Sequence, residues 1–246
     1  MDRLVYVAMS GAKETMRAQA ANSHNLANAS TTGFRADLSA FMSRAVQGDG
    51  IESRVYATDT SIGWDGSNGQ AQYTGGNLDI AINGDGWIAV QGSDGREAYT
   101  RAGDLRVDVS GQLMTGAGHP VLGDGGPMIV PPHTSISIAR DGSVSIIPLG
   151  QEATTTATVG RIKLVHPASN AIDRGADGLF RMKDGSDAPA DASVQLLNGS
   201  LESSNVNVAD AMTQMIELAR RYELQVKSIR TAEDDARSSA SLLQPG

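Results

Sequence analysis

The chain contains no cysteine, and aromatic residues make up only 4% of its 246 residues. Without cysteine, disulfide bonds, thiol catalysis and cysteine-ligated metal sites are excluded. The core must therefore be built from Val, Ile, Leu, Met and Ala, within a total hydrophobic content of 40%. No apolar run approaches 18 residues, so we expect no segment that spans a membrane.

The motifs that mark common enzyme sites are also missing. The sequence has no Gly-x-Ser-x-Gly, no P-loop and no Gly-x-Gly-x-x-Gly that opens a helix. It has no calcium loop, and its histidines lack metal-ligand spacing. We therefore expect no cofactor, no metal and no catalytic residue. Because glycosidase carboxylates pair in space and not in sequence, a secreted β-fold hydrolase or sugar-binding module stays as an alternative class.

Basic charge is scarce, since 20 Lys and Arg stand against 28 Asp and Glu, for a net charge of −8. No segment carries the basic field that nucleic-acid binding requires, so no nucleic acid is expected as a partner. The first 16 residues do not read as a secretory signal, because Asp2, Lys13 and Glu14 interrupt their apolar character. We expect a protein that is cytoplasmic or exported by a route without a cleaved signal.

Turn residues are concentrated in the middle of the chain. Of 28 glycines, 25 lie between Gly48 and Gly199, and 7 of 8 prolines lie between Pro120 and Pro189. Eight Asp-Gly and three Asn-Gly dipeptides fall in the same stretch, and these pairs favour the positive φ values of hairpin turns. The distribution predicts an α+β fold in which a turn-rich β body separates two terminal helices.

The two ends show helical spacing. Val5, Met9, Ala12 and Met16 follow a 4-3-4 pattern that predicts a helix with a narrow apolar face, ending near Asn28. After Gly199 a heptad register begins, with Asn207 or Asp210 as its cap. Because such thin stripes are marginal alone, we expect the helices to pair with each other or with neighbouring copies. The seam positions of the C-terminal register are Val208, Ala211, Met215, Leu218, Tyr222, Gln225, Ile229, Ala232, Ala236, Ser239 and Leu243.

These patterns predict three parts. Residues 1–35 with 201–246 form a terminal helical coiled-coil domain, and residues 36–75 form an extended connector. Residues 76–200 form a β-rich domain whose short strands suggest an irregular barrel or sandwich. In it, residues 78–82 and 87–90 are expected to pair across the Asn83–Gly86 turn, and Ser93–Gly95 is a second turn.

Two polar helix surfaces allow more than one interpretation. Asn22, Asn25 and Asn28 recur every three residues, either as a plain polar face or as amides that bond to neighbouring chains. Glu223 and Lys227 stand four apart and provide either local helix support or a subunit contact. The spacing alone does not decide between these interpretations.

Three stretches together resemble the rod and hook axial proteins of the bacterial flagellum. Residues 25–34 (Asn-Leu-Ala-Asn-Ala-Ser-Thr-Thr-Gly-Phe) resemble the family's N-terminal signature, and residues 201–207 (Leu-Glu-Ser-Ser-Asn-Val-Asn) resemble its C-terminal signature. Residues 78–87 and 99–105 resemble the shared middle region. Trp87 and Leu105 depart from the family pattern, which has aromatic phenylalanines there. The opening residues are most similar to proximal-rod members, with distal-rod members as the alternative.

The resemblance implies a structural, non-enzymatic subunit that acts in motility. The helices would form an inner coiled coil lining the export channel, and the β body an outer domain of a torque-transmitting rod. The chain would pass unfolded through the flagellar type III export apparatus to the periplasmic rod. Its partners would be that apparatus, other rod subunits and copies of itself, with no small-molecule substrate. The implied subunit-contact residues are Asn22, Asn25, Leu26, Asn28, Thr32, Gly33, Phe34, Asn205, Val206, Asn207, Met215, Leu218, Tyr222 and Ile229.

Overall fold

The computed structural model describes residues 2–45, 55–151 and 155–242, and the chain divides into two compact units. Unit 1 comprises Met1–Asn28, Ala36–Trp64 and Val206–Gly246. Unit 2 comprises Ala29–Arg35 and Asp65–Asn205. The two ends of the chain therefore belong to one unit, and the turn-rich middle to the other.

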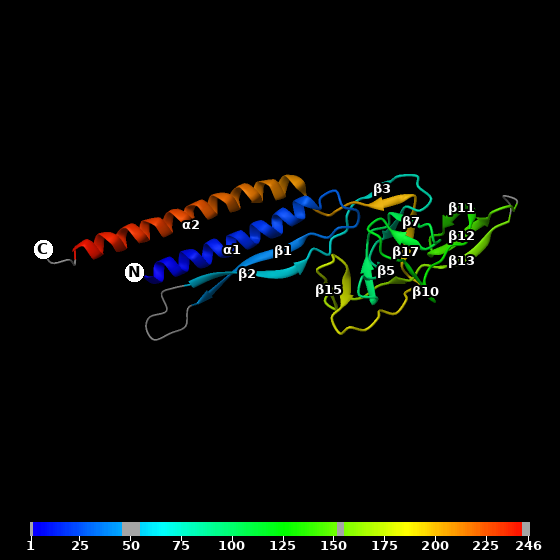
Figure 1. Ribbon diagram of the computed structural model, residues 1–246, viewed down its shortest axis with the longest axis horizontal. Helices are drawn as coiled ribbons and strands as arrows, with labels where there is room; N and C mark the ends of the chain where they lie inside the picture. The colour runs from blue at the N-terminus through cyan, green and yellow to red at the C-terminus, as the bar shows by residue number, and fades with distance from the viewer. Residues whose placement is uncertain (1, 46–54, 152–154, 243–246) are drawn as a thin grey trace. The chain divides into compact units, whose positions relative to one another are not determined.

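Unit 1 contains two long helices and one β-hairpin. The helices are α1 (Asp2–Ala27) and α2 (Val208–Leu242), and the antiparallel strands are β1 (Asp37–Ala45) and β2 (Val55–Trp64). The helices lie side by side (Figure 1) and run antiparallel, since Thr15 contacts Gln225 whereas Asn22 contacts Ala211. Asn207 caps α2, because its Oδ1 accepts a hydrogen bond from the amide of Ala209 at 3.0 Å.

The packed face of α1 differs from the face that the sequence predicted. Met9 and Met16 are 53% and 56% exposed, while Thr15, Ala18 and Asn22 are buried. Small residues lie at the contact with α2: a Cβ added at Gly11 would lie 2.9 Å from Nε2 of the Gln225 side chain. The helical periodicity of α1 is correct, but the predicted contact face, which includes Met9 and Met16, is wrong. The smaller side chains of Thr15, Ala18 and Asn22 are the buried ones.

Residues 36–75, expected as an extended connector, contain the β1–β2 pair of unit 1 and strand β3 (Ala71–Tyr73) of unit 2. The β2 sequence, Val-Tyr-Ala-Thr-Asp-Thr-Ser-Ile-Gly-Trp, is rich in β-branched and aromatic residues, which favour a pleated strand. A register shift between Leu38 and Ser39 interrupts the pairing. The poor alternation of this segment therefore reflects an irregular hairpin and not unpaired chain.

Unit 2 holds short strands of two to six residues in several small sheets. The largest has the order β14-β5-β6-β16-β15, and a second has the order β11-β12-β13. No sheet of the described residues closes on itself, so the barrel alternative of the sequence prediction is wrong. The bounds of the other strands are β4 (Ile80–Asn83), β5 (Trp87–Gln91), β6 (Glu97–Thr100), β7 (Leu105–Val107), β8 (Leu113–Thr115), β9 (Leu122–Gly123), β10 (Gly126–Pro127), β11 (His133–Ile138), β12 (Ser143–Pro148), β13 (Ala157–Arg161), β14 (Leu164–Val165), β15 (Ile172–Arg174), β16 (Phe180–Met182), β17 (Gln195–Asn198) and β18 (Ser200–Glu202).

The order of strand pairing corrects one sequence expectation. The turn at Ser93–Gly95 joins β5 to β6 as predicted, with Gly95 at φ 77°. The expected hairpin between residues 78–82 and 87–90 is absent from the described pairing, because β4 pairs with β17 and β5 pairs with β6 and β14. Ile80, Ala81 and Ile82 are all buried, so this strand is covered on both faces. The first and last strands of unit 2 therefore close on each other, since β3 also pairs with β18.

The hydrophobic cluster of unit 2 consists of Ile, Val, Leu, Ala and Met side chains, and Trp87, Tyr99 and Phe180 are also buried in this unit. Ile80, Ile88, Val90, Leu113 and Val144 are all 0% exposed within one hydrophobic cluster. None of the described helices combines the length and the apolar character that a membrane-spanning helix needs.

Candidate assembly site

The end of the N-terminal signature is buried within unit 2. The amide of Gly33 donates a hydrogen bond to the carbonyl of Glu202 at 2.8 Å. Gly33 has a φ of 67°, and a Cβ there would lie 2.3 Å from the carbonyl carbon of Arg101, so only glycine fits. Phe34 is 7% exposed, and the guanidinium carbon of Arg174 lies 4.4 Å from its ring centroid.

The C-terminal signature meets the same place through a buried ionic cluster, which we call the clasp: Arg35, Arg101 and Glu202. The two carboxylate oxygens of Glu202 lie 2.8 Å from Nη2 of Arg35 and 2.7 Å from Nη1 of Arg101. The side chains of all three residues are at most 3% exposed. Burial lowers the pKa of Arg35, although the neighbouring carboxylate of Glu202 opposes that shift.

Sequence reasoning did not identify the clasp. The available signal was that Arg35 and Glu202 stand inside or beside the two signature stretches. Charged residues are almost never fully buried unless they are paired, but the sequence alone does not show which ones are buried.

Asn205 connects the C-terminal signature to two other parts of unit 2. Its backbone N–H donates to the carbonyl of Phe34 at 3.3 Å. Its side-chain Nδ2 donates to the carbonyls of Asp65 at 3.2 Å and Ser67 at 3.0 Å. Thr32 in the same unit is half-buried. Several residues expected to contact neighbouring subunits therefore have well-defined partners within the chain.

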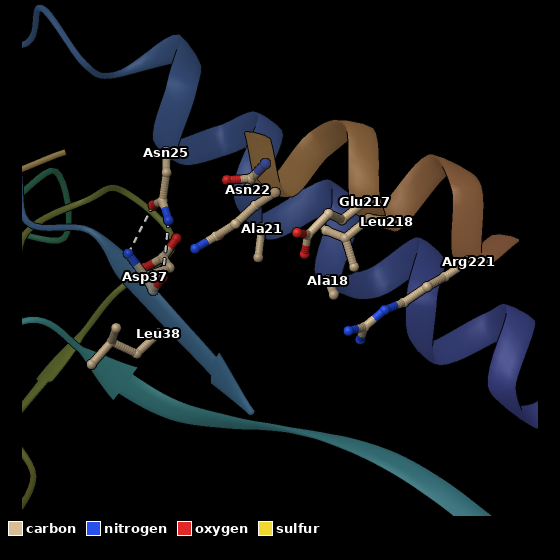
Figure 2. A pocket seen from close by; sticks show the side chains of 10 residues that line it. Ala18, Ala21, Asn22, Asn25, Asp37, Leu38, Glu217, Leu218 and Arg221 are labelled. Atoms are coloured by element: carbon tan, nitrogen blue, oxygen red, sulfur yellow. Dashed lines mark hydrogen bonds between the residues drawn. The ribbon is translucent and has the colours of Figure 1, made fainter. Parts of the chain in front are cut away.

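A pocket of about 260 Å³ lies in unit 1 between the helices and the start of β1 (Figure 2). At one side of the pocket, Asn25 and the main chain of Asp37 form two hydrogen bonds. Nδ2 of Asn25 donates to the carbonyl of Asp37 at 2.9 Å, and the backbone N–H of Asp37 donates to Oδ1 of Asn25 at 2.8 Å. The buried Asn22 donates to the carbonyl of Ala211 at 2.7 Å. Glu217 and Arg221 of α2 line the same pocket.

All three asparagines of the predicted polar face thus make hydrogen bonds within unit 1, since Nδ2 of Asn28 donates to the carbonyl of His24 at 2.9 Å. These bonds fix the relative positions of α1, α2 and β1. A contact from the same amides to neighbouring chains stays a prediction. Leu26 on α1 and Val206, which precedes α2, are half-buried, and Asn207 is exposed.

Most members of the predicted heptad seam of α2 whose burial is described are buried or half-buried, but Val208 is 41% exposed and Leu243 lies outside the described residues. Leu218 is 8% exposed, and Met215, Tyr222 and Ile229 are half-buried. Other apolar side chains of unit 1 stay exposed in two rows, which we call the exposed apolar stripes. They are Tyr6 (63%), Met9 (53%) and Met16 (56%) on α1, and Met212 (52%), Ile216 (64%) and Leu224 (65%) on α2.

The described residues hold no group of three or more His, Cys, Asp or Glu side chains placed to bind a metal ion. The features that distinguish this molecule are therefore two helices with uncovered apolar side chains and a β unit closed by the two signatures. Such features belong to a protein that assembles with partners.

Comparison with known proteins agrees with this class. Residues 5–35 match the family model "Flagella basal body rod protein", and residues 81–146 match "Flagellar hook protein FlgE/F/G D1 domain". Residues 197–242 match "Flagellar basal body rod FlgEFG protein C-terminal". The matched regions are those that carry the three sequence signatures.

Similar full-length proteins extend the match to the whole chain. Flagellar basal-body rod protein FlgF of Escherichia coli (strain K12) is 44% identical, with 99% of each chain covered. FlgF of Caulobacter vibrioides is 34% identical, covering 99% of this chain and 98% of that protein. Flagellar basal-body rod protein FlgG of Buchnera aphidicola subsp. Acyrthosiphon pisum is 33% identical, covering 86% of this chain and 88% of that protein.

The class is that of the axial proteins of the bacterial flagellum. The chain belongs to the flagellar basal-body rod protein family, among the FlgF relatives, and is a structural rod subunit in motility.

Proposed function

We propose that this chain polymerises in the proximal part of the rod, where it helps to form the axial drive shaft that transmits torque and encloses the export channel. Its partners are copies of itself and other proximal- and distal-rod subunits. In this proposal it catalyses no reaction. The match to FlgF of Escherichia coli, at 44% identity over 99% of this chain, exceeds the match to FlgG of Buchnera aphidicola, at 33% over 86%, and supports the proximal position over the distal one.

The observation that carries the proposal is the pair of exposed apolar stripes. Met212 and Ile216 are four residues apart on α2, and Met9 and Met16 are seven apart on α1, so each row follows one side of its helix. A helix pair that leaves such rows in water gains free energy when a partner covers them. Contacts that join different surfaces of successive copies build open helical assemblies, as a rod requires.

The inner part of the proposed rod is built from α1 and α2 in a coiled-coil arrangement. Four positions of the heptad seam on α2 support this arrangement, because Leu218 is buried and Met215, Tyr222 and Ile229 are half-buried. We further propose that the chain reaches the periplasmic rod through the flagellar export apparatus without a cleaved signal. Marginal helices suit that route, since helices with thin apolar stripes gain much of their stability from packing against partners.

The test replaces one exposed apolar residue with a charge. Ile216→Lys on α2 should leave the unfolding midpoint of the purified protein within about 2 °C of the parent, because surface substitutions cost at most about 0.5 kcal/mol. In cells the same variant should abolish incorporation into basal bodies and swimming. The matched control is Val109→Lys in unit 2, where an apolar side chain is fully exposed outside the helices. Normal rods with Ile216→Lys would contradict the proposal.

Complementation separates the proximal from the distal position. In a flagellated bacterium whose own FlgF has been deleted, expression of this chain should restore swimming. In a strain of the same bacterium that lacks FlgG, it should not. Rescue of the second strain alone would place the chain in the distal rod.

A further inference from the structure

Four segments of unit 2 that are far apart in sequence meet at the clasp, around Arg35, Asn68, Arg101 and Glu202. Arg35 ends the segment Ala29–Arg35, and Glu202 lies in β18 near the end of the unit at Asn205. Arg35 also donates to the carbonyl of Ser67 and, from Nη2, to Oδ1 of Asn68 at 2.8 Å. The clasp therefore joins residues next to three of the points at which the chain passes between the two units. It leaves unit 2 after Arg35, enters it again at Asp65 and leaves it after Asn205.

The electrostatics of the clasp are unbalanced. Two guanidinium groups face one carboxylate, so the buried cluster has a net charge of +1. Backbone carbonyls accept several of the remaining N–H groups: Nε of Arg101 donates to Gly86 at 2.9 Å and its Nη2 donates to Gly84. Nε of Arg35 is buried and has no hydrogen-bond partner among the described residues. A buried ion cluster with an incomplete set of partners adds little net stability, so its value lies in which segments it fixes.

The hydrophobic core of unit 2 lies in other strands. Ile88 and Val90 of β5 and Val144 of β12 are fully buried in the apolar cluster, and none of the clasp residues belongs to it. Beside the buried ring of Phe34 and the contact of Arg101 with the ring of Trp87 at 5.7 Å, hydrogen bonds and charge hold the segments that meet at the clasp. For example, the backbone N–H of Gly33 donates to the carbonyl of Glu202 at 2.8 Å. The backbone N–H of Gly69 donates to Oε1 of Glu202 at 2.9 Å. Local stability varies across a domain, and regions with fewer apolar contacts open first.

We propose that the clasp is a conformational latch within one chain, which opens before the sheets of unit 2 and releases the segments next to its chain exits. In this view the two signature stretches recognise each other inside the subunit, in addition to any role in contacts between subunits. Glu202 is the positioning residue, because it contacts both arginines and accepts hydrogen bonds from the amides of Gly33 and Gly69. The inference concerns the isolated monomer and does not depend on the proximal position in the rod.

The first experiment measures hydrogen–deuterium exchange on the purified full-length chain carrying Glu202→Gln. The substitution keeps the shape of the side chain but leaves two buried cations without a carboxylate, so the clasp should open. The amides of Gly33, Gly69, Gln70 and Ser203 should exchange at least about tenfold faster, while the amides that pair β5 with β6 change less than about threefold. The control is Asp177→Asn, which removes a surface ion pair to Arg181 in the same unit.

Two results would overturn the latch. Unchanged exchange at the four amides would show that Glu202 does not hold these segments. An equal acceleration in β5 and β6 would show that the clasp supports the whole unit and does not open separately.

A second variant tests the charge argument and covers the case in which Glu202→Gln does not fold. Arg35→Met removes one cation and leaves the neutral pair of Glu202 and Arg101, so exchange at Gly69 should accelerate less than in Glu202→Gln. The faster exchange should also be confined to the segments around Gly33, Gly69, Gln70 and Ser203. If Arg35→Met has the larger effect, or if it accelerates exchange throughout β5 and β6, the latch is wrong and Arg35 acts through packing.

Discussion

Units 1 and 2 use the same apolar residue types in opposite ways. Ile80 and Ile88 of unit 2 are 0% exposed, whereas Ile216 and Leu224 of α2 are 64% and 65% exposed. Unit 2 also has exposed apolar residues, such as Val109, but they are scattered over strands and turns. In unit 1 they recur at helical intervals. Unit 2 therefore has a continuous buried core, whereas α1 and α2 of unit 1 leave rows of apolar side chains exposed.

The difference shows where stability comes from in each unit. Unit 2 gains it from aliphatic side chains removed from water, at about 25 cal/mol per Å² of apolar surface. Unit 1 brings its helices together through Gly11, Thr15, Ala18 and Asn22, which bury little apolar area. Substitutions in unit 2 should therefore show their cost in the monomer, and substitutions on the stripes should show theirs in the assembly.

The largest effect on the monomer should come from the core of unit 2. Ile88→Ala removes a fully buried side chain from β5, an inner strand of the largest sheet, and should lower the free energy of unfolding by about 2–5 kcal/mol. Ile216→Ala, the same change on the exposed stripe, should cost no more than about 0.5 kcal/mol. Denaturant unfolding of both variants makes the comparison. Similar losses would show that the two units do not differ in this way.

A backbone substitution at the signature should rank second. Gly33→Ala would place a Cβ against the backbone of Arg101 at a φ of 67°, and should cost at least about 2 kcal/mol. Gly95→Ala is the control, because it has a similar φ of 77° but its Cβ would meet no described atom within 4 Å. Its cost should stay near 1 kcal/mol, roughly that of the left-handed backbone alone. Equal thermal shifts in the two variants would mean that the close approach at Gly33 relaxes easily.

The sequence predicted the elements better than their partners. Both terminal helices and the heptad seam of α2 follow from local periodicity, which a sequence displays directly. The packed face of α1 was misassigned because contact there depends on how closely two helices approach, a property of the pair. The pairing of β4 with β17 was missed because more than 110 residues separate the strands, and local turn signals favour the nearer partner.

The signature stretches teach the same lesson for the site. Gly33, Phe34 and Asn205 were identified as important from their resemblance to a family, but their contacts within the chain were not foreseen. A buried charged cluster depends on three residues at positions 35, 101 and 202, and no spacing rule connects them. The motifs thus drew attention to these residues, and only the fold showed which groups they meet within the chain. Their contacts to neighbouring subunits stay a prediction.

A smaller effect should come from the helix contact of unit 1. Asn22→Ala removes the hydrogen bond to the carbonyl of Ala211 and should cost about 1 kcal/mol. The melting of the helices, followed by circular dichroism at about 222 nm, should shift downward, while Ser23→Ala on the exposed neighbouring position should not shift it. If Asn22→Ala melts like the parent, the amide does not stabilise the helix pair in the monomer. Its role then lies in the contact between subunits that the sequence suggested.

The smallest effect lies in a surface ion pair of unit 2. The hydrogen bond from Arg181, with Nη2 2.6 Å from Oδ2 of Asp177, lowers the pKa of that carboxyl despite some desolvation. A carboxyl whose pKa is lower in the folded state stabilises the fold above its unfolded pKa of about 3.9 and loses that contribution as the pH falls through the folded value. Asp177→Asn should therefore destabilise unit 2 at pH 6 by well under about 1 kcal/mol, because solvent screens the pair. The difference from the parent should shrink below pH 4 and at high salt, and a difference that grows with acidity would contradict the assignment.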